Sequence, residues 1–395
     1  MNDLYDCGRR LEAARKRLST LPYAELLLAF LDHLKALGLS DNRVLKYANS
    51  LSTIFKNTPF NPAEATKRDV ERAVAWINAQ PYKSWTKHGL KLALKRLVQY
   101  TKHGSCDAKT PTPPEVDWIP MKVDERDNRV KPETLLTADD VKAMMMRAEN
   151  KRDRALVSVL FEAALRPGEL LGMKVGSVEF KENYCIITVN GKTGVKRIPI
   201  VASYRPLLEW LEEHPKKDEI EAPLWASLSN NSKAEGISYY YLRKLLRRLA
   251  EKAGLKKDVW PYLLRHSCLT LLAKVFTESK LKLYAGWVME SKMVKRYVHF
   301  STRDLEGAVL ELHGLKEADS TSQILKANDC PRCKRKNPPD SVRCGFCGFI
   351  LDKKVSMEME EKHVERLEEI FRRLERLEEV VYALLHGGNG FPQQQ

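Results

Sequence analysis

Apolar residues recur at helical spacing from Tyr23 to about Tyr100. The stretches LLLAFLDHLKALG, VLKYANSLSTIF, DVERAVAWINA and GLKLALKRLVQY each place apolar side chains three or four positions apart. Gly38, Pro59, Pro62 and Pro81 fall between these stretches, where helices are expected to end. The pattern predicts a small all-helical domain over residues 1–104.

A proline-rich stretch then separates two periodic regions. Charged residues replace apolar ones between residues 105 and 136, which predicts a linker. The prolines of this stretch are Pro111, Pro113, Pro114, Pro120 and Pro132. Helical spacing resumes at TADDVKAMMMRAEN, where Thr137 and Asp140 have the spacing of a capping box. We expect a second domain over residues 137–318.

One segment of the second domain alternates apolar and polar residues with a period of two. In YCIITVNGKTGVKRIPIV the alternation runs on both sides of Asn190-Gly191, which predicts a β-hairpin with Lys192 at its tip. Helical patterns follow in RPLLEWLEEH, YYYLRKLLRRLAEKAG, YLLRHSCLTLLAKV, LKLYAGWV and KMVKRYVHF. The sequence therefore predicts a mainly α chain with one small β-sheet, of the α+β class.

Charge and composition narrow the classes of partner. The chain has 67 Lys and Arg against 52 Asp and Glu, a net charge of +15, and such a surplus attracts polyanions. Nucleic acid is the leading partner class, and a basic protein without such a partner is the alternative. No apolar run approaches the roughly 20 residues that a membrane span needs. No apolar core of a secretory signal follows the basic start, so we expect a cytoplasmic, nucleoid-associated protein.

Basic and aromatic residues cluster in the segment PYKSWTKHGLK of the first domain. Side chains of these types can follow a phosphate backbone. The candidate DNA-binding residues are Lys83, Trp85, Lys87, His88 and Lys91. The alternative is a solvated helix face with Trp85 in the core.

Two CxxC pairs stand close together near the C-terminus, in residues 326–352. The spacing of Cys330 and Cys333 from Cys344 and Cys347 is typical of a zinc ribbon that holds one Zn²⁺ through four thiolates. Such a zinc is structural, because no coordination position stays open. A pair of disulfides is the alternative.

A helix is expected over residues 356–386, before a disordered tail at 387–395. Its apolar residues recur in steps of three and four, as a coiled coil requires: Leu367, Ile370, Leu374, Leu377, Val381 and Leu384. The helix could pair two protomers or fold against its own domain.

Single residues dispersed over the second domain form a recognisable series. They are Arg166 at a helix break, Lys192 on the hairpin, Arg265 in PYLLRHS, Trp287 in AGWV and Tyr297 in KRYVHF. With the flanking matches LRPGELLGMKVGSV, KTGVKRIPI, LLRHS and AGW with RYVH, the chain resembles the tyrosine site-specific recombinase, or phage integrase, family over residues 137–315.

The resemblance implies a role for each residue of the series. Tyr297 is the nucleophile that attacks a DNA phosphate, and Arg166 and Arg265 grip its non-bridging oxygens. Lys192 is the general acid for the departing 5′ oxygen. Trp287 donates its indole N–H to the phosphate. The chemistry needs no nucleotide cofactor, because the phosphotyrosyl link preserves the energy of the broken bond.

The sequence departs from the commonest family pattern at one position. Tyr262 stands three residues before Arg265, where histidine is usual. As a member of the site it can still hydrogen-bond the phosphate, but tyrosine is a poor base at neutral pH. Proton removal from Tyr297 therefore needs another route. Similar replacements indicate the archaeal-type integrase branch. We expect Glu169 and His266 to support the site rather than to react.

The resemblance also implies partners and leaves alternatives open. A duplex DNA recombination site is the expected substrate, with four copies of the chain acting on two sites. The first alternative is a DNA-binding architectural or regulatory protein of the same fold with weakened catalysis. An interaction protein dominated by the ribbon and the coiled coil is another, and a topoisomerase-like activity would use the same chemistry.

Overall fold

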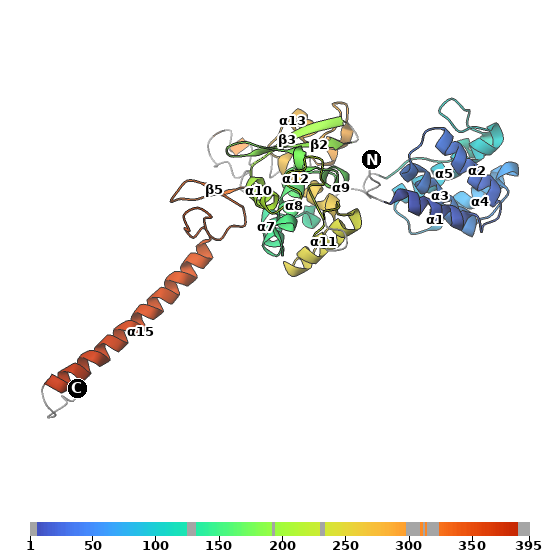
Figure 1. Cartoon of the computed structure of the whole chain (residues 1–395). Coiled ribbons are helices and arrows are strands. Elements are labelled where there is room, and N and C mark those ends of the chain that lie inside the picture. Colours follow the sequence, from blue (N-terminus) through green and yellow to red (C-terminus); the bar gives the residue numbers. More distant parts are fainter. Residues whose placement is uncertain are drawn as a thin grey trace. The chain divides into compact units, whose positions relative to one another are not determined.

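The chain forms two compact units, which are described separately here (Figure 1). The computed structural model describes residues 6–124, 132–191, 194–229, 234–297, 309–310, 313 and 324–385. One unit comprises Met1–Thr134 and Ser238–Tyr240, and the other comprises Leu135–Ile237 and Tyr241–Gln395. Mainly helical structure with small antiparallel sheets confirms the expected fold class.

The first unit is a helical bundle. Its helices are α1 (Cys7–Leu18), α2 (Ala24–Ala36), α3 (Asp41–Asn57), α4 (Lys67–Ala79), α5 (Ser84–His103) and the short α6 (Pro114–Asp117), with a 3₁₀ turn at Pro62–Glu64. Their apolar faces meet in one core, where Phe30, Leu51, Ile54 and Leu94 are fully buried. Burial of these faces, rather than helix propensity alone, holds such short helices together.

The expected linker contributes to this bundle at its start. Cys106, Val116 and Ile119 are buried in the core of the unit, and the side chain of Gln99 donates hydrogen bonds to the carbonyls of Thr110 and Pro111. Residues 105–124 are therefore packed chain rather than a free connector. Prolines exclude helix periodicity, but they leave the apolar side chains between them available for burial.

The second unit surrounds one buried helix. Its helices are α7 (Ala138–Met146), α8 (Lys151–Glu162), α9 (Pro167–Leu171), α10 (Tyr204–Glu212), α11 (Tyr239–Lys252), α12 (Pro261–Leu272) and α13 (Glu278–Ala285), with 3₁₀ turns η4 (Val175–Ser177) and η6 (Lys292–Arg296). The first two residues of α11 and the turn η3 (Pro132–Thr134) are grouped with the first unit. Nearly every residue of α8 from Ala155 to Phe161 is buried, and α8 contacts α7, α10 and α12. The capping box expected at Thr137 and Asp140 is confirmed at the start of α7.

The expected hairpin belongs to a three-stranded antiparallel sheet. Strands β1 (Val178–Phe180), β2 (Cys185–Gly191) and β3 (Gly194–Ile200) pair in the order β1-β2-β3. Asn190 pairs with Val195 and Gly191 with Gly194. The turn predicted at Asn190-Gly191 was therefore placed two residues too early. Asn-Gly favours a tight turn, but here both residues extend the strand.

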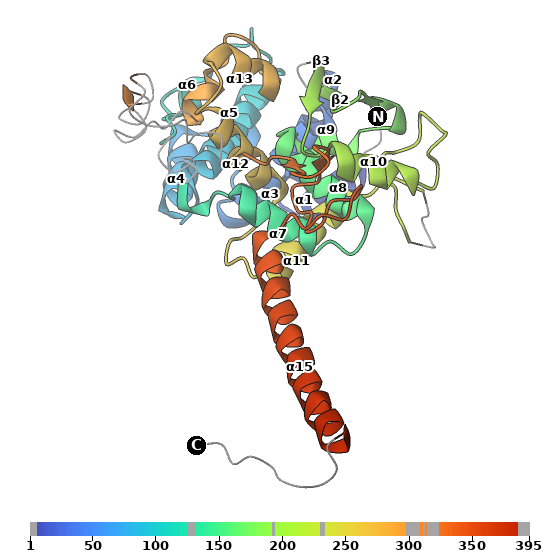
Figure 2. The same cartoon turned by 90° about the vertical axis from the view of Figure 1, so that its left-hand side faces the viewer.

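The C-terminal region carries a small hairpin and a long helix. Strands β4 (Asn328–Asp329) and β5 (Lys336–Asn337) pair antiparallel, and α15 runs unbroken over Lys353–Leu385 (Figure 2). None of the helices in the described ranges combines the length and apolar character that a bilayer crossing requires. The expected domain end at 318 and the tail at 387–395 lie outside the described residues.

Candidate active site and nucleic-acid interface

Arg166 is positioned by a sharp break between two helices. Helix α8 ends at Glu162, and Pro167 starts α9 as its first residue. Arg166 therefore has an extended backbone, with φ −69° and ψ 147°. The carboxylate of Glu169, one turn into α9, accepts hydrogen bonds from the backbone N–H of Arg166 at 2.9 Å and from its guanidinium at 2.5 Å. This local loop locks the direction of the arginine side chain.

The same carboxylate collects two further cations. Nζ of Lys196 lies 2.9 Å from Glu169, and Nη1 of Arg265 lies 3.8 Å from it. Burial alone would raise the pKa of Glu169, but the charge of Lys196 and the hydrogen bonds from Arg166 hold it below its ordinary value. Glu169 thus stays ionised at the centre of a cationic cluster.

Arg265 approaches this cluster from α12. Its side chain is buried, and its guanidinium donates hydrogen bonds to the carbonyls of Ala164 at 2.5 Å and Ala285 at 2.8 Å. The guanidinium carbon also lies 5.9 Å from the ring centre of Trp287. A guanidinium has five N–H donors in total, so these two bonds leave donors for a ligand.

Tyr297 lies at the end of η6, beside Trp287 and His266. Its side chain is only 3% exposed, and its ring stacks on Trp287 with 5.4 Å between centroids. Its phenol oxygen lies 2.8 Å from Nδ1 of His266. Burial raises the pKa of Tyr297, although the charges of nearby arginines, Arg265 foremost, oppose that rise.

His266 has a larger place in the site than its sequence position indicated. Burial, with the charges of Arg296 and Arg265, lowers the pKa of His266 to about 4, so the imidazole is neutral at pH 7. Tyr262, one turn earlier on α12, is 38% exposed, and its ring centre lies 6.3 Å from that of His266. The group in hydrogen-bond contact with the phenol is therefore His266.

Lys192 lies outside the described residues, but the end of β2 just before it reaches the cluster. A Cβ on Gly191 would lie 2.6 Å from a carboxylate oxygen of Glu169, so only glycine lets the strand approach so closely. Lys196, from β3 of the same hairpin, was missed from the sequence. The alternation of side chains along the strand could have revealed it, because Lys196 lies on the inward face together with the buried Ile198 and Ile200.

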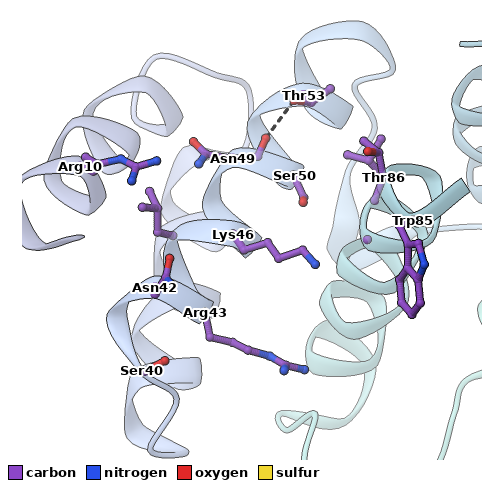
Figure 3. A pocket seen from close by; sticks show the side chains of 13 residues that line it. Arg10, Ser40, Asn42, Arg43, Lys46, Asn49, Ser50, Thr53, Trp85 and Thr86 are labelled. Carbon is purple, nitrogen blue, oxygen red and sulfur yellow. Dashed lines mark hydrogen bonds between the residues drawn. The ribbon is translucent and has the colours of Figure 1, made fainter. Parts of the chain in front are cut away.

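A basic pocket opens on the helical unit. It has a volume of about 730 Å³ and lies between α1, α3 and α5. Figure 3 shows Arg43 and Lys46 extending from α3 toward the α5 side, with Trp85 opposite and Arg10 on α1. Among the described residues that line the pocket there is no carboxylate. Its surface therefore suits an anion.

The cluster predicted from PYKSWTKHGLK is divided between two faces of α5. Trp85 is 51% exposed and lines the pocket, and Lys83 is an exposed residue just before the helix. Lys87 donates to the carbonyl of Asn78 at 2.7 Å, Nδ1 of His88 lies 3.0 Å from the carbonyl of Met121, and Lys91 is only 8% exposed. The pocket cations Arg10, Arg43 and Lys46 come from other helices, so no local sequence pattern unites them with Trp85.

The four C-terminal cysteines converge. The sulfur atoms of Cys330, Cys333, Cys344 and Cys347 all lie within 4.8 Å of one another, as a shared metal ion requires. All four are free thiols, which argues against the disulfide alternative. The cysteine segment, residues 328–350, contacts helix α8 of the second unit, because Nε and Nη2 of the Arg154 side chain both bond to the carboxylate of Asp340, at 2.7 and 2.6 Å.

Comparison with known proteins agrees with this geometry. The phage integrase family model matches residues 134–303. Tyrosine recombinase XerA of Pyrococcus horikoshii is 26% identical over 250 residues, which cover 62% of this chain and 79% of XerA. The XerD recombinase of Vibrio cholerae is 25% identical over 179 residues, 44% of this chain and 57% of its own length.

Two solved structures share the fold. XerH site-specific recombinase bound to its difH substrate has a TM-score of 0.55 at 20% identity, covering 78% of this chain and 96% of XerH. The Tn1549 transposon integrase in complex with transposon right-end DNA has a TM-score of 0.55 at 16% identity, covering 73% and 99%. The convergence of Arg166, Arg265 and Tyr297 and the family match over the same range lead to one conclusion: residues 134–303 of this chain form a phage integrase family domain, similar to those of tyrosine recombinases.

Proposed function

We propose that the chain cleaves and rejoins DNA at specific sites through a 3′-phosphotyrosine intermediate on Tyr297. The observation that carries this proposal is the environment of the phenol, which is buried in the field of Arg265 and Arg166 and hydrogen-bonded to a neutral imidazole. An isolated surface tyrosine has none of these features. All these groups belong to one chain, so we expect Tyr297 to attack DNA bound by its own subunit.

Two guanidiniums would hold the scissile phosphate. Arg166 and Arg265 would donate to its non-bridging oxygens, on which negative charge builds as the nucleophile approaches. Glu169 would not react. It holds Arg166 directly and balances the charge of Lys196, so that the cluster exists before DNA binds.

His266 would supply the proton route that Tyr262 cannot. The phenol O–H of Tyr297 would donate to Nδ1 of His266 and pass its proton there as the oxygen attacks phosphorus. The bond from phosphorus to the 5′ oxygen breaks in the same step, and that oxygen takes a proton from Lys192. In the second step a 5′ hydroxyl of the partner strand attacks phosphorus and gives its proton to Lys192. The bond from phosphorus to the phenol oxygen breaks, and the phenolate of Tyr297 takes its proton back from His266.

A covalent trap tests this function. The substrate is a duplex built on a site selected from random DNA by binding to this chain, nicked so that the cleaved fragment diffuses away. We expect the wild-type chain to become covalently linked to the DNA and Tyr297→Phe to bind it without a link. Binding with no covalent product in either protein would instead support the architectural protein of the same fold.

The helical unit would bind the DNA backbone through its basic pocket. Arg43 and Lys46 from α3 and Trp85 from α5 would contact phosphate and sugar, which position a protein on DNA without reading its sequence. We propose this pocket as the DNA contact in place of Lys87, His88 and Lys91, because the polar atoms of those side chains already have partners within the unit.

The cysteine cluster would hold one structural Zn²⁺. Four thiolates suit a tetrahedral site and leave no position for a substrate, so the metal would stabilise the hairpin and take no part in strand transfer. Metal analysis of the purified chain should find about one zinc per chain, and Cys344→Ser should lose it. Zinc-free protein with an intact hairpin would refute this assignment.

The working assembly would be four copies on two DNA sites, as the resemblance implies. Its substrate is cellular DNA, so we expect the protein to act in the cytoplasm at the nucleoid. The archaeal-type branch also stays a prediction. Recovery of synaptic complexes that contain two duplexes and four chains would test the assembly.

A further inference from the structure

Helix α15 has an apolar stripe that its own chain does not cover. Every side chain from Val364 to Tyr382 is exposed, and the exposed fractions of Leu367, Leu374 and Leu377 are 44%, 48% and 59%. Near the start of the helix, Nη2 of Arg343 contacts the sulfur of Met359 at 3.4 Å. Of the two alternatives that the sequence left open, a helix folded against its own domain does not occur over these residues.

The stripe has the geometry of a coiled-coil seam. Steps of three and four assign Leu367, Leu374 and Val381 to position a of a heptad, and Ile370 and Leu377 to position d. A helix exposing these residues to water gains most by packing them against a second helix with the same spacing. The simplest helix with that spacing is α15 of another copy.

Charges beside the seam select an orientation. Arg373 occupies position g, and Glu378, five residues later, occupies position e of the next heptad. In a parallel pair these two positions face each other across the seam, so Arg373 meets Glu378 of the partner subunit. In an antiparallel pair, position g of one helix faces position g of the other. Arg366 and Arg373, which both occupy position g, would then face arginines across the seam.

The base of α15 is anchored, so pairing would act on the whole enzyme. The cysteine segment joins helix α8 of the second unit through the ion pair between Arg154 and Asp340, and the guanidinium of Arg205 from α10 lies 5.1 Å from the ring centre of Phe346. Helix α15 follows this segment after Asp352, whose carbonyl accepts the backbone N–H of Ser356.

We propose that α15 forms a parallel coiled coil with α15 of a second copy, so that the recombinase is self-associated before it meets DNA. The partner is a second copy because one helix carries both the apolar seam and the complementary flanking charges. This inference does not depend on the chemistry at Tyr297. Its failure would leave the proposed strand transfer untouched.

The mass of the full chain without DNA is the first test. We expect light scattering to give twice the chain mass, and Leu374→Glu to give the mass of one chain. Arg372→Glu places the same new carboxylate on the outer face of the helix and should remain associated. A single-chain mass for the wild type, or an unchanged mass for Leu374→Glu, would overturn the proposal.

A charge exchange tests the orientation. Arg373→Glu and Glu378→Arg each put like charges across a parallel seam and should weaken self-association by about fivefold. Arg373→Glu also removes the pairing with Glu369 within the helix, at 2.7 Å, so the decisive result is the mixture. Mixed in equal amounts, the two variants should form heterodimers more tightly than either forms homodimers. No preference for the mixed pair would rule out the parallel arrangement.

Discussion

A single buried carboxylate organises the cations of the active site. Glu169 contacts Arg166 and Lys196 directly and lies within 3.8 Å of Arg265, although its own side chain is almost inaccessible. Buried charges of one sign destabilise a fold unless a counter-charge accompanies them. The cations of this cluster therefore depend on Glu169 for their presence as well as for their direction.

Removing that charge should cost both stability and activity. We expect Glu169→Gln to lower the free energy of unfolding by about 3 kcal/mol, because three cations lose their shared counter-charge. Urea unfolding followed by circular dichroism measures this change. Glu179→Gln is the matched control: its carboxylate pairs with Arg197 on an exposed strand, and its loss should leave stability unchanged. Equal effects of the two substitutions would contradict the central position of Glu169.

Replacing His266 should slow cleavage more than replacing Tyr262. His266→Phe keeps an aromatic ring but removes the acceptor nitrogen, so we expect covalent complex formation to slow by about 100-fold at pH 7. The deficit should shrink at high pH, where solvent removes the phenol proton. Tyr262→Phe should cleave at nearly the wild-type rate. A larger loss in Tyr262→Phe would return the proton-accepting role to that position.

The same histidine links stability to pH. Its pKa is about 4 in the folded chain against 6.5 for an unperturbed group, so between these values the unfolded chain binds a proton that the folded chain does not. The stabilising effect of the neutral ring is fully present above pH 6.5 and is lost as the pH falls toward 4. The free energy of unfolding should rise with pH across this window, less steeply in His266→Phe.

The order of residue types along the chain predicted part of the site. Contacts between residues far apart in the sequence could not be predicted in this way. Arg166, Arg265, Trp287 and Tyr297 were found because their types and flanks follow a known series, and the structure brings them together. Contact between His266 and Tyr297 joins residues 31 positions apart, and no spacing rule predicts it.

Among the elements, two close approaches hold the hairpin at the site. Gly191 passes against Glu169, and Gly286, at the end of α13, passes against the side chain of Lys196. Gly286 has φ +65°, and a Cβ there would lie 2.9 Å from Cδ of Lys196. Strand and helix thus meet through positions where only glycine fits.

Gly286→Ala should therefore cost more than backbone strain alone. Gly254 is a matched control, because its φ is +73° and a Cβ there would meet nothing within 4 Å. We expect Gly254→Ala to lower stability by about 1 kcal/mol and Gly286→Ala by about twice as much. Thermal unfolding of the two variants compares them. Equal stability of the two variants would mean that the Lys196 side chain moves aside without cost.

Helices were easier to predict from the sequence than connections. The 3.6-residue periodicity identified helices α2 to α5 of the bundle, because burial of one face enforces it, but it missed α1. The segment 105–124 was mistaken for a free linker and the turn at 190–191 was misplaced, because local preferences yield to tertiary packing and strand register.

For the whole molecule, the account assigns DNA contact to both units. Cations gather at the pocket of Arg43 and Lys46 and at the cluster around Glu169. Neither surface follows from net charge, which reports only that polyanions are attracted.

The pocket of the helical unit should govern the affinity for DNA rather than the rate of strand cleavage. Arg43→Ala and Lys46→Ala should each weaken binding to duplex DNA and reduce the slope of log affinity against log salt by about one. Lys87→Ala is the control, because its ammonium already bonds to Asn78. Filter binding at several salt concentrations gives both quantities. A larger effect in Lys87→Ala would move the interface to the other face of α5.

The central claim is that the phenol oxygen of Tyr297 becomes joined to DNA. Mass spectrometry of the covalent complex, after protease and nuclease digestion, identifies the linked residue directly. The account predicts a nucleotide attached through its 3′ phosphate to the peptide that contains Tyr297. A nucleotide attached to any other residue, or joined through a 5′ phosphate, would contradict it.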